Sequence, residues 1–250
     1  MCMTLLRRIA MAAVFFGIAA SPALAEDFSP AKRAEIESIV REYLLNNPTL
    51  LLEVMEKLEE QQKQAARSQA SESIMANKQE LFESDTDYVF NPDGAIPVVE
   101  FFDYQCGYCK RMLPSVVRLL DENRSVRFIY KEFPILGEMS TVASKAALAA
   151  KRQGKYLDYH NALMAMRRPL DEASIYDTAA EVGLDVERLK KDMNDPTIQD
   201  IIERNRSLGQ NMGLRGTPSF IVGDALVPGA LEYDRLVALV ERMGESCEVC

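Results

Sequence analysis

Apolar residues recur with helical spacing in the segment that begins near residue 29. Five of them stand at positions i, i+3, i+4, i+7 and i+8 and therefore share one face of an α-helix: Ile36, Ile39, Val40, Tyr43 and Leu44. The positions between them are mostly charged or polar. The pattern predicts an amphipathic helix with a single apolar face.

Capping and breaking residues mark the ends of this helix and the start of a second one. Ser29 can cap the first helix, and Pro30 fits its first turn. The run Asn-Asn-Pro at 46–48 ends that helix and starts another, whose apolar stripe continues at Leu51, Met55 and Leu58. Residues 61–79 are nearly all polar or Ala. Two such helices cannot bury their stripe alone, so we expect it to pack on the main domain or on other copies of the chain.

From residue 85 the pattern alternates between strands and helices. Apolar runs predict strands at 88–90, 98–102, 126–130 and 219–222. Helical spacing predicts helices at 110–120, 140–151, 155–166, 171–182, 185–193, 197–212 and 232–243. A small sheet whose third and fourth strands are separated by a block of helices indicates an α/β domain with a helical insertion. We expect a stalk and linker over 26–84, the domain over 85–246 with its insertion at about 138–212, and a tail at 247–250.

The first 25 residues have the pattern of a targeting segment. Arg7 and Arg8 precede an apolar run over 9–20, and Ala-Leu-Ala at 23–25 offers a small-x-small cleavage site. The apolar run is shorter than the ~20 residues that a membrane-spanning helix needs. We therefore expect residues 1–25 to be a cleaved signal peptide and the product, beginning at Glu26, to be exported and soluble.

Composition narrows the class of protein. With 250 residues and 48% hydrophobic side chains, the chain can bury a core of its own. A net charge of −9 argues against nucleic-acid binding, which usually needs a basic face. Loss of Cys2 with the signal leaves four cysteines in two Cys-x-x-Cys pairs. An even number favours disulfide chemistry in an oxidising compartment, although four are too few to staple a chain of this length.

One of these pairs, Cys106-Gly-Tyr-Cys109, lies between an apolar strand and a helix. A helix N-terminus offers unpaired N–H groups and a partial positive charge, which favour the thiolate of the first cysteine. A lone Cys-x-x-Cys could also be half of a zinc site, but this setting favours redox chemistry. We expect Cys106 to be the attacking thiol and Cys109, one helical turn on, to be the resolving thiol.

The residues around the thiol pair refine this prediction. Gly107-Tyr108 carries no positive charge, so we expect the cysteine pKa to be less extreme than it would be with a histidine between the cysteines. His160 lies far along the chain in a predicted helix, and we expect it to pack or to lie at the surface. Glu100 stands in the middle of an apolar strand, where a carboxylate is costly. It is either a buried acid that relays the proton of the resolving thiol or a solvated residue on an edge strand.

Thr217-Pro218 directly precedes the last predicted strand. A proline that enters a central strand cannot donate a ladder hydrogen bond, so its presence needs a reason. A cis bond in a tight turn is one such reason. It would leave the adjacent backbone free to pair with a bound peptide.

Together these features resemble the thioredoxin superfamily, specifically its periplasmic DsbA-like branch. The resemblance covers about 89–244 and rests on Glu100, the Cys106–Cys109 pair, Pro114, the helical insertion and Thr217-Pro218, with the segment Tyr-Lys-Glu-Phe-Pro at 130–134 also similar. It implies a thioredoxin fold, catalytic Cys106, resolving Cys109, buried Glu100 and a cis Pro218 facing the disulfide. Thr217 and Tyr108 would contact substrate, and the redox-active disulfide would need no further cofactor.

Two departures from that branch bear on the direction of the chemistry. Gly-Tyr replaces the Pro-His of its strongly oxidising members, and Thr217 replaces a valine before the proline. A Thr-Pro pair at this position resembles the one found in disulfide isomerases. The stalk sequence resembles that of ScsC (suppressor of copper sensitivity) proteins, in which it can drive trimerisation and so place several sites around one substrate.

The resemblance predicts a periplasmic disulfide isomerase that acts as a homo-oligomer on misoxidised or unfolded exported proteins and exchanges electrons with a membrane partner. A monomeric dithiol oxidase and a copper-binding protein are the alternatives. The second pair, Cys247 and Cys250, matches nothing in the family pattern. It is an inert terminal disulfide, an accessory dithiol or a weak candidate site for a soft metal such as Cu(I).

Overall fold

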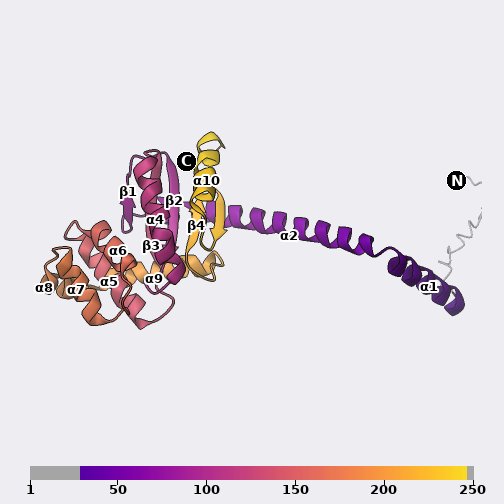
Figure 1. Ribbon diagram of the computed structural model, residues 1–250, viewed down its shortest axis with the longest axis horizontal. Helices are drawn as coiled ribbons and strands as arrows, with labels where there is room; N and C mark the ends of the chain where they lie inside the picture. Colours follow the sequence, from indigo (N-terminus) through magenta and orange to yellow (C-terminus); the bar gives the residue numbers. More distant parts are fainter. Residues whose placement is uncertain (1–28, 247–250) are drawn as a thin grey trace, which may run out of the picture. The chain divides into compact units, whose positions relative to one another are not determined.

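The computed structural model describes residues 29–246, in two compact units that divide between Leu58 and Glu59 (Figure 1). The helices are α1 (Pro30–Asn46), α2 (Pro48–Ala76), α3 (Lys78–Phe82), α4 (Gly107–Glu122), α5 (Glu138–Lys151), α6 (Tyr156–Ala165), α7 (Glu172–Glu181), α8 (Val186–Asp192), α9 (Pro196–Asn211) and α10 (Tyr233–Ser246). The strands are β1 (Tyr88–Phe90), β2 (Ile96–Phe102), β3 (Val126–Glu132), β4 (Ser219–Val222) and β5 (Ala225–Pro228). No helix in the described part of the chain is long and apolar enough to cross a membrane.

The first unit consists of α1 and the beginning of α2. Ser29 Oγ accepts the N–H of Lys32 at 3.3 Å, and Pro30 occupies the first turn. Asn47 separates the two helices, and both its backbone N–H and its side-chain amide donate to the carbonyl of Tyr43, at 3.0 and 2.8 Å. Both helices predicted for this segment are confirmed, including the break between them.

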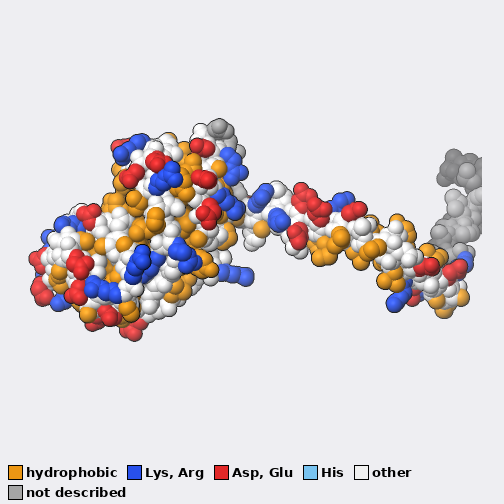
Figure 2. All heavy atoms as spheres, viewed as in Figure 1, with side chains coloured by type: hydrophobic (Ala, Val, Ile, Leu, Met, Phe, Trp, Pro, Cys, Tyr) orange, Lys and Arg blue, Asp and Glu red, His pale blue; other side chains and the backbone are white. Residues whose placement is uncertain are grey.

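The apolar stripe of this unit lies on its surface. No residue of α1 is buried, and Ile39 and Leu52 are 60% and 66% exposed. Figure 2 shows the apolar side chains gathered along α1 and the first part of α2. This single chain therefore presents an uncovered apolar stripe in its first unit.

The second unit is built on a five-stranded sheet with the order β1-β3-β2-β4-β5. β2 and β3 are parallel, and the other neighbours are antiparallel. The four predicted strands are confirmed, and β5 is an addition. It follows β4 through a two-residue turn in which Gly223 supplies the positive φ of 59° that such a hairpin needs. Its four residues, Ala-Leu-Val-Pro, are apolar but only partly buried or exposed, and the run is short and ends in a proline.

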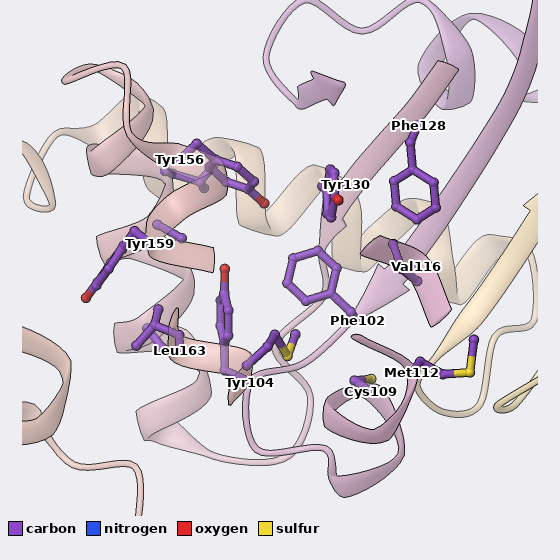
Figure 3. Packing of buried hydrophobic residues seen from close by; sticks show 14 of the residues in the cluster. Phe102, Tyr104, Cys109, Met112, Val116, Phe128, Tyr130, Tyr156, Tyr159 and Leu163 are labelled. Carbon is purple, nitrogen blue, oxygen red and sulfur yellow. The ribbon is translucent and has the colours of Figure 1, made fainter. Parts of the chain in front are cut away.

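One face of the sheet packs on α4, α10 and the insertion. Val98 and Phe102 of β2 and Tyr130 of β3 lie on this face, and α4 supplies Met112 and Val116 (Figure 3). The insertion spans α5 to α9 between β3 and β4, as predicted. The thioredoxin fold with a DsbA-like helical insertion is thus confirmed.

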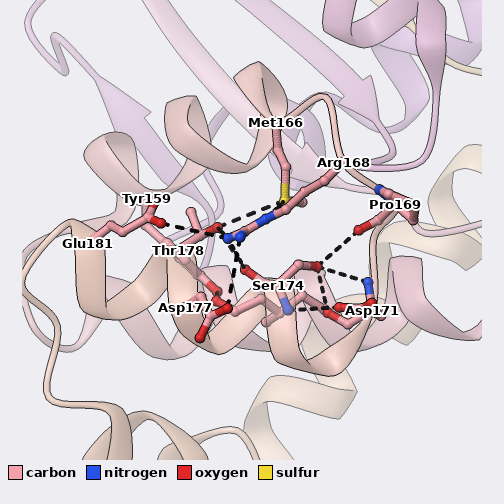
Figure 4. Close-up of polar contacts among 10 residues, drawn as sticks. Tyr159, Met166, Arg168, Pro169, Asp171, Ser174, Asp177, Thr178 and Glu181 are labelled. Atoms are coloured by element: carbon pink, nitrogen blue, oxygen red, sulfur yellow. Dashed lines mark hydrogen bonds and ion pairs between the residues drawn. The ribbon is translucent and has the colours of Figure 1, made fainter.

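Three of the insertion helices, α7, α8 and α9, begin with an aspartate side-chain cap. Asp171 Oδ1 accepts the N–H of Ser174 at 2.7 Å, and Ser174 Oγ accepts the N–H of Asp171 at 2.9 Å, which makes a reciprocal capping box for α7 (Figure 4). Arg168 reaches the same helix and donates to the hydroxyl of Thr178 at 3.3 Å. These contacts fix the loop that joins α6 to α7.

The opposite face of the sheet is covered by residues that the sequence assigns to the linker. Ile74, Leu81 and Phe82 are buried against Val99 and Phe101 of β2. Residues 59–84 therefore fall within the second unit. These few apolar side chains lie in a segment that is otherwise mostly polar or Ala, so the sequence pattern does not predict that they are buried.

A buried ion pair fastens this linker to the sheet. Lys131 of β3 is 1% exposed, and its Nζ donates to Asp87 Oδ2 at 2.5 Å and to the carbonyl of Glu80 at 2.6 Å. Asn205 of α9 donates to the other oxygen of Asp87 at 3.2 Å. The strand, the linker and the insertion thus meet at one buried carboxylate.

Replacing Lys131 with methionine should strongly destabilise the protein. Methionine fills similar space but leaves the Asp87 charge buried without its partner, and breaking such a pair costs about 3–5 kcal/mol. Denaturant titration measures this as a lower free energy of unfolding. Lys190→Met removes the exposed pair with Glu187 and is the matched control, expected to unfold close to the wild type. Equal midpoints for the two variants would contradict the prediction.

Candidate functional site

The two cysteines of the predicted site stand where β2 leads into α4. Cys106 is the N-cap of α4, and its Sγ accepts the N–H of Cys109 at 3.4 Å. Both are free thiols and both are buried, with 5% exposure for Cys106 and 2% for Cys109. The attacking position is therefore the slightly more accessible of the two, and the helix N-terminus faces its sulfur.

The loop before β4 completes the site from a distant part of the chain. The Thr217–Pro218 bond is cis, and the carbonyl of Thr217 accepts the thiol of Cys106 at 3.1 Å. β4 pairs antiparallel with β2, so the start of β4 lies at the same sheet edge as the end of β2. The hydroxyl of Thr217 is buried and has no other hydrogen-bond partner in the described chain, which leaves it free to donate to the Cys106 sulfur when this is a thiolate.

The surroundings drive the pKa values of the two thiols apart. Hydrogen bonding from the Cys109 side chain, with smaller contributions from the Thr217 hydroxyl and the backbone of α4, outweighs burial and lowers the pKa of Cys106 to about 5. The same hydrogen bond, together with burial and the charge of Glu100, raises the pKa of Cys109 well above its usual range. Cys106 is thus a thiolate when Cys109 is still a thiol. A pKa near 5 lies between about 7 for thioredoxin and about 3.5 for DsbA.

Glu100 lies in β2, between β3 and β4, on the face covered by α4. It is buried, so the edge-strand alternative does not hold. Burial, and secondly the charge of Cys106, raises the pKa of Glu100 to about 8. A carboxyl group with this pKa can take up or release a proton near neutral pH.

Tyr108 is 60% exposed and stacks with an arginine that the sequence analysis does not single out. The guanidinium carbon of Arg111 lies 4.1 Å from the centre of the Tyr108 ring. A methyl group placed on Gly107 would come within 3.9 Å of an Arg111 nitrogen. The Gly-Tyr pair itself is uncharged, but a cation therefore lies over it. The i, i+3 spacing of Tyr108 and Arg111 at the start of a helix is the signal that could have found it.

Asp103 organises the turn that carries Cys106, and it too was missed. Its carbonyl accepts the N–H of Cys106 at 3.0 Å. Its buried carboxylate accepts four hydrogen bonds of 2.7 to 2.9 Å, from the N–H groups of Gln105, Ile135 and Leu136 and the hydroxyl of Ser140. The signal that could have identified Asp103 in the sequence is an acidic residue at the end of an apolar run, three positions before the first cysteine.

A second buried carboxyl group, that of Glu132 at the end of β3, joins the same turn to the insertion. Glu132 Oε1 accepts the hydroxyls of Tyr104 and Tyr156 at 3.0 and 2.7 Å. His160 Nδ1 lies 3.1 Å from the Tyr104 hydroxyl, and burial lowers the pKa of His160 to about 3. His160 is therefore a neutral, buried packing residue, the first of the two roles that the sequence left open.

Some predicted features lie outside the described residues. Cys247 and Cys250 are among them, as are residues 1–25, so the tail and the signal peptide stay predictions. Within residues 29–246 there is no group of three or more His, Cys, Asp or Glu side chains that could hold a metal ion.

Two family descriptions match the chain. Residues 97–241, more than half of the chain, match the DSBA-like thioredoxin domain. Residues 33–65 match the N-terminal domain of the copper resistance protein ScsC.

Similar proteins share the same parts. A thioredoxin-like oxidoreductase from Silicibacter pomeroyi DSS-3 is 45% identical with a TM-score of 0.67, over 68% of this chain and 99% of that one. Proteus mirabilis ScsC in a transitional conformation is 30% identical with a TM-score of 0.65, over 88% of this chain and 98% of that one.

A curated relative, the Na(+)/H(+) antiporter NhaA 3 of Salinispora tropica, is 29% identical over 159 residues, which are 62% of this chain and 24% of the antiporter. The chain thus spans about a quarter of that relative's length. The match over 97–241 and the ScsC structure together identify the protein: the chain belongs to the family of DSBA-like thioredoxin-domain proteins and carries an N-terminal domain of the ScsC type.

Proposed function

We propose that the chain is a periplasmic thiol-disulfide oxidoreductase with disulfide isomerase activity, which acts as a homo-oligomer through Cys106 and Cys109. The observation that carries the proposal is the pairing of a low-pKa thiol, in contact with the cis-proline loop, with a buried thiol of high pKa. Relatives described as a thioredoxin-like oxidoreductase and as a periplasmic thioredoxin-like protein support it.

The chemistry is thiol-disulfide exchange. The Cys106 thiolate attacks a substrate disulfide, which forms a mixed disulfide and releases one substrate thiolate. That thiolate can attack another disulfide of the substrate, and the last substrate thiolate then displaces Cys106. No net electrons pass in this cycle, which is isomerisation.

Reduction is the other outcome of the same intermediate. Cys109 attacks the Cys106 sulfur, gives its proton to the Glu100 carboxylate and releases the substrate thiolate. Two electrons then pass from the Cys106–Cys109 dithiol to the substrate. The moderate pKa of Cys106 and the threonine before Pro218 favour rearrangement over strong oxidation.

The exposed stripe supports the oligomer. Ile36, Val40 and Leu44 line an apolar hollow of about 520 Å³ on α1. Such a surface is expected to be covered by the same segment of other copies, and the match to the ScsC N-terminal domain covers these residues. Several dithiols around one substrate would suit the repeated exchange that isomerisation needs.

A copper-binding function is the second candidate, because the matching N-terminal domain is described from a copper resistance protein. It requires tight Cu(I) binding that survives Cys106→Ser and Cys109→Ser and is lost with Cys247→Ser and Cys250→Ser. Equilibrium competition with a Cu(I) chelator measures this. Loss of binding with Cys106 would instead assign the metal to the redox pair.

Thr217→Val should raise the pKa of Cys106 by about one unit, because valine keeps the shape of threonine and removes a hydroxyl that stabilises the thiolate. The rate of alkylation as a function of pH measures the change, with a wild-type midpoint near 5. Thr49→Val, on exposed α2, is the isosteric control. An unshifted midpoint in Thr217→Val would show that the Thr217 hydroxyl does not contribute to the low pKa of Cys106.

Glu100→Gln should slow the release of a peptide from its mixed disulfide with Cys106 by about tenfold above pH 8. Burial, the larger cause of the raised pKa of Glu100, persists in the mixed disulfide, whereas the Cys106 charge is absent there. The carboxyl becomes a proton acceptor as the pH passes its pKa, so the wild-type release rate should rise with pH up to about 8. Stopped-flow fluorescence of a labelled peptide follows the release. A rise of the same size and position in the glutamine variant would contradict the relay.

Ile39→Glu together with Met55→Glu should reduce the oligomer to single chains, because both side chains belong to the exposed stripe and a charge there is costly to bury. Light scattering gives the mass, and refolding of a scrambled-disulfide protein gives the isomerase rate, which should fall with it. Ser38→Glu adds a charge to the opposite face of α1 as a control. Full isomerase activity in dissociated chains would show that the stalk serves another purpose.

A further inference from the structure

Resting on this proposed function, we propose that Arg111 and Arg215 bind a carboxylate that neighbours the substrate disulfide, so that substrates with acidic side chains beside their cysteines are preferred. Arg111 belongs to α4, and Arg215 belongs to the loop that leads to the cis-proline. Each is exposed.

Arg111 is oriented toward the thiol end of its helix. Helical side chains lean toward the N-terminus, and the contact with the Tyr108 ring holds the guanidinium there. Its nitrogen beside Gly107 lies next to the residue that follows Cys106. An exposed arginine with a fixed direction loses little conformational freedom when it binds an anion.

Arg215 belongs to the loop that touches the sulfur. It stands two residues before Thr217, so the two Cα atoms are at most about 7 Å apart. Arg215 lines a hollow of about 330 Å³ together with Leu214, Thr217, Pro218 and Leu226. Thr217, whose carbonyl contacts Cys106, lines this hollow as well, so a peptide bound along the loop passes the guanidinium of Arg215.

Neither cation is neutralised within the described part of the chain. Arg111 and Arg215 have no ion pair and no side-chain hydrogen bond among residues 29–246, whereas Arg118, Arg152 and Arg188 each pair with a carboxylate. The first turn of α4 contains no acidic side chain. Both guanidinium groups are therefore available to bind an anion, in a chain whose net charge is −9.

The chemistry of exchange explains what these cations would do. An anionic thiolate that attacks a disulfide flanked by carboxylates meets like charge. Guanidinium groups bind carboxylates through two parallel hydrogen bonds and offset this repulsion. The bonds made and broken are those of ordinary exchange: Cys106 Sγ bonds to one substrate sulfur, and the other leaves as a thiolate. The carboxylate can belong to an acidic peptide segment or to glutathione, which share this chemistry.

The test compares two peptide disulfides of identical sequence except for glutamate or lysine on both sides of the cysteine. In the full-length protein, Arg111→Glu with Arg215→Glu should lower the exchange rate of the acidic peptide about tenfold and raise that of the basic peptide. Oxidised glutathione is a third substrate and shows whether a small carboxylate donor depends on the same arginines. The wild-type preference should weaken as salt is added.

The ratio of acidic to basic rates separates binding from a change in thiol reactivity, which would affect all substrates alike. Arg124→Glu makes the same charge change before β3, at the opposite sheet edge, and should leave the ratio unchanged. Arg111→Gln with Arg215→Gln repeats the test without adding charge. An unchanged ratio in the arginine variants overturns the carboxylate proposal while the exchange activity stands. A wild type inactive on every disulfide overturns the proposed function itself.

Discussion

The pairing of β2 on both of its edges is the constraint on which the rest of the structure depends. β2 is buried on both faces and lies between β3, which is parallel to it, and β4, which is antiparallel. This arrangement brings three loops to one edge of the sheet: the turn at Asp103, the loop after β3 and the cis-proline loop. The thiol of Cys106 emerges among them, so its contacts follow from strand order rather than from its neighbours in sequence.

Two buried carboxyl groups near this edge are treated differently by their surroundings. The Asp103 carboxylate accepts four donors and joins the turn to the loop at 135–136. Glu100 has the thiols for neighbours, and burial leaves its pKa near 8. Asp103 is therefore suited to fix the conformation of the turn, and Glu100 is suited to exchange a proton. The two carboxyl groups are only three residues apart, so a structural residue and a residue suited to proton transfer come from the same short segment.

Features carried by local pattern were predictable from the sequence. The strands, the insertion, the position of Cys106 at a helix start and the burial of Glu100 follow from apolar runs and from spacing within one motif. Arg111 was missed because its contact with Tyr108 depends on where its side chain folds back, and Asp103 because three of its four donors lie more than thirty positions away. The burial of Ile74 and Phe82 was missed for a similar reason, since it depends on the face of a sheet formed later in the chain.

The packing of α3 has a consequence for how this domain can be recombined with others. Ile74, Leu81 and Phe82 complete one face of the sheet, and Lys131 reaches across to the carbonyl of Glu80. A fragment that began at the first strand would expose Val99 and Phe101 to water. The portable module thus starts inside α2, and any fusion, natural or designed, must inherit that piece of helix along with the dithiol.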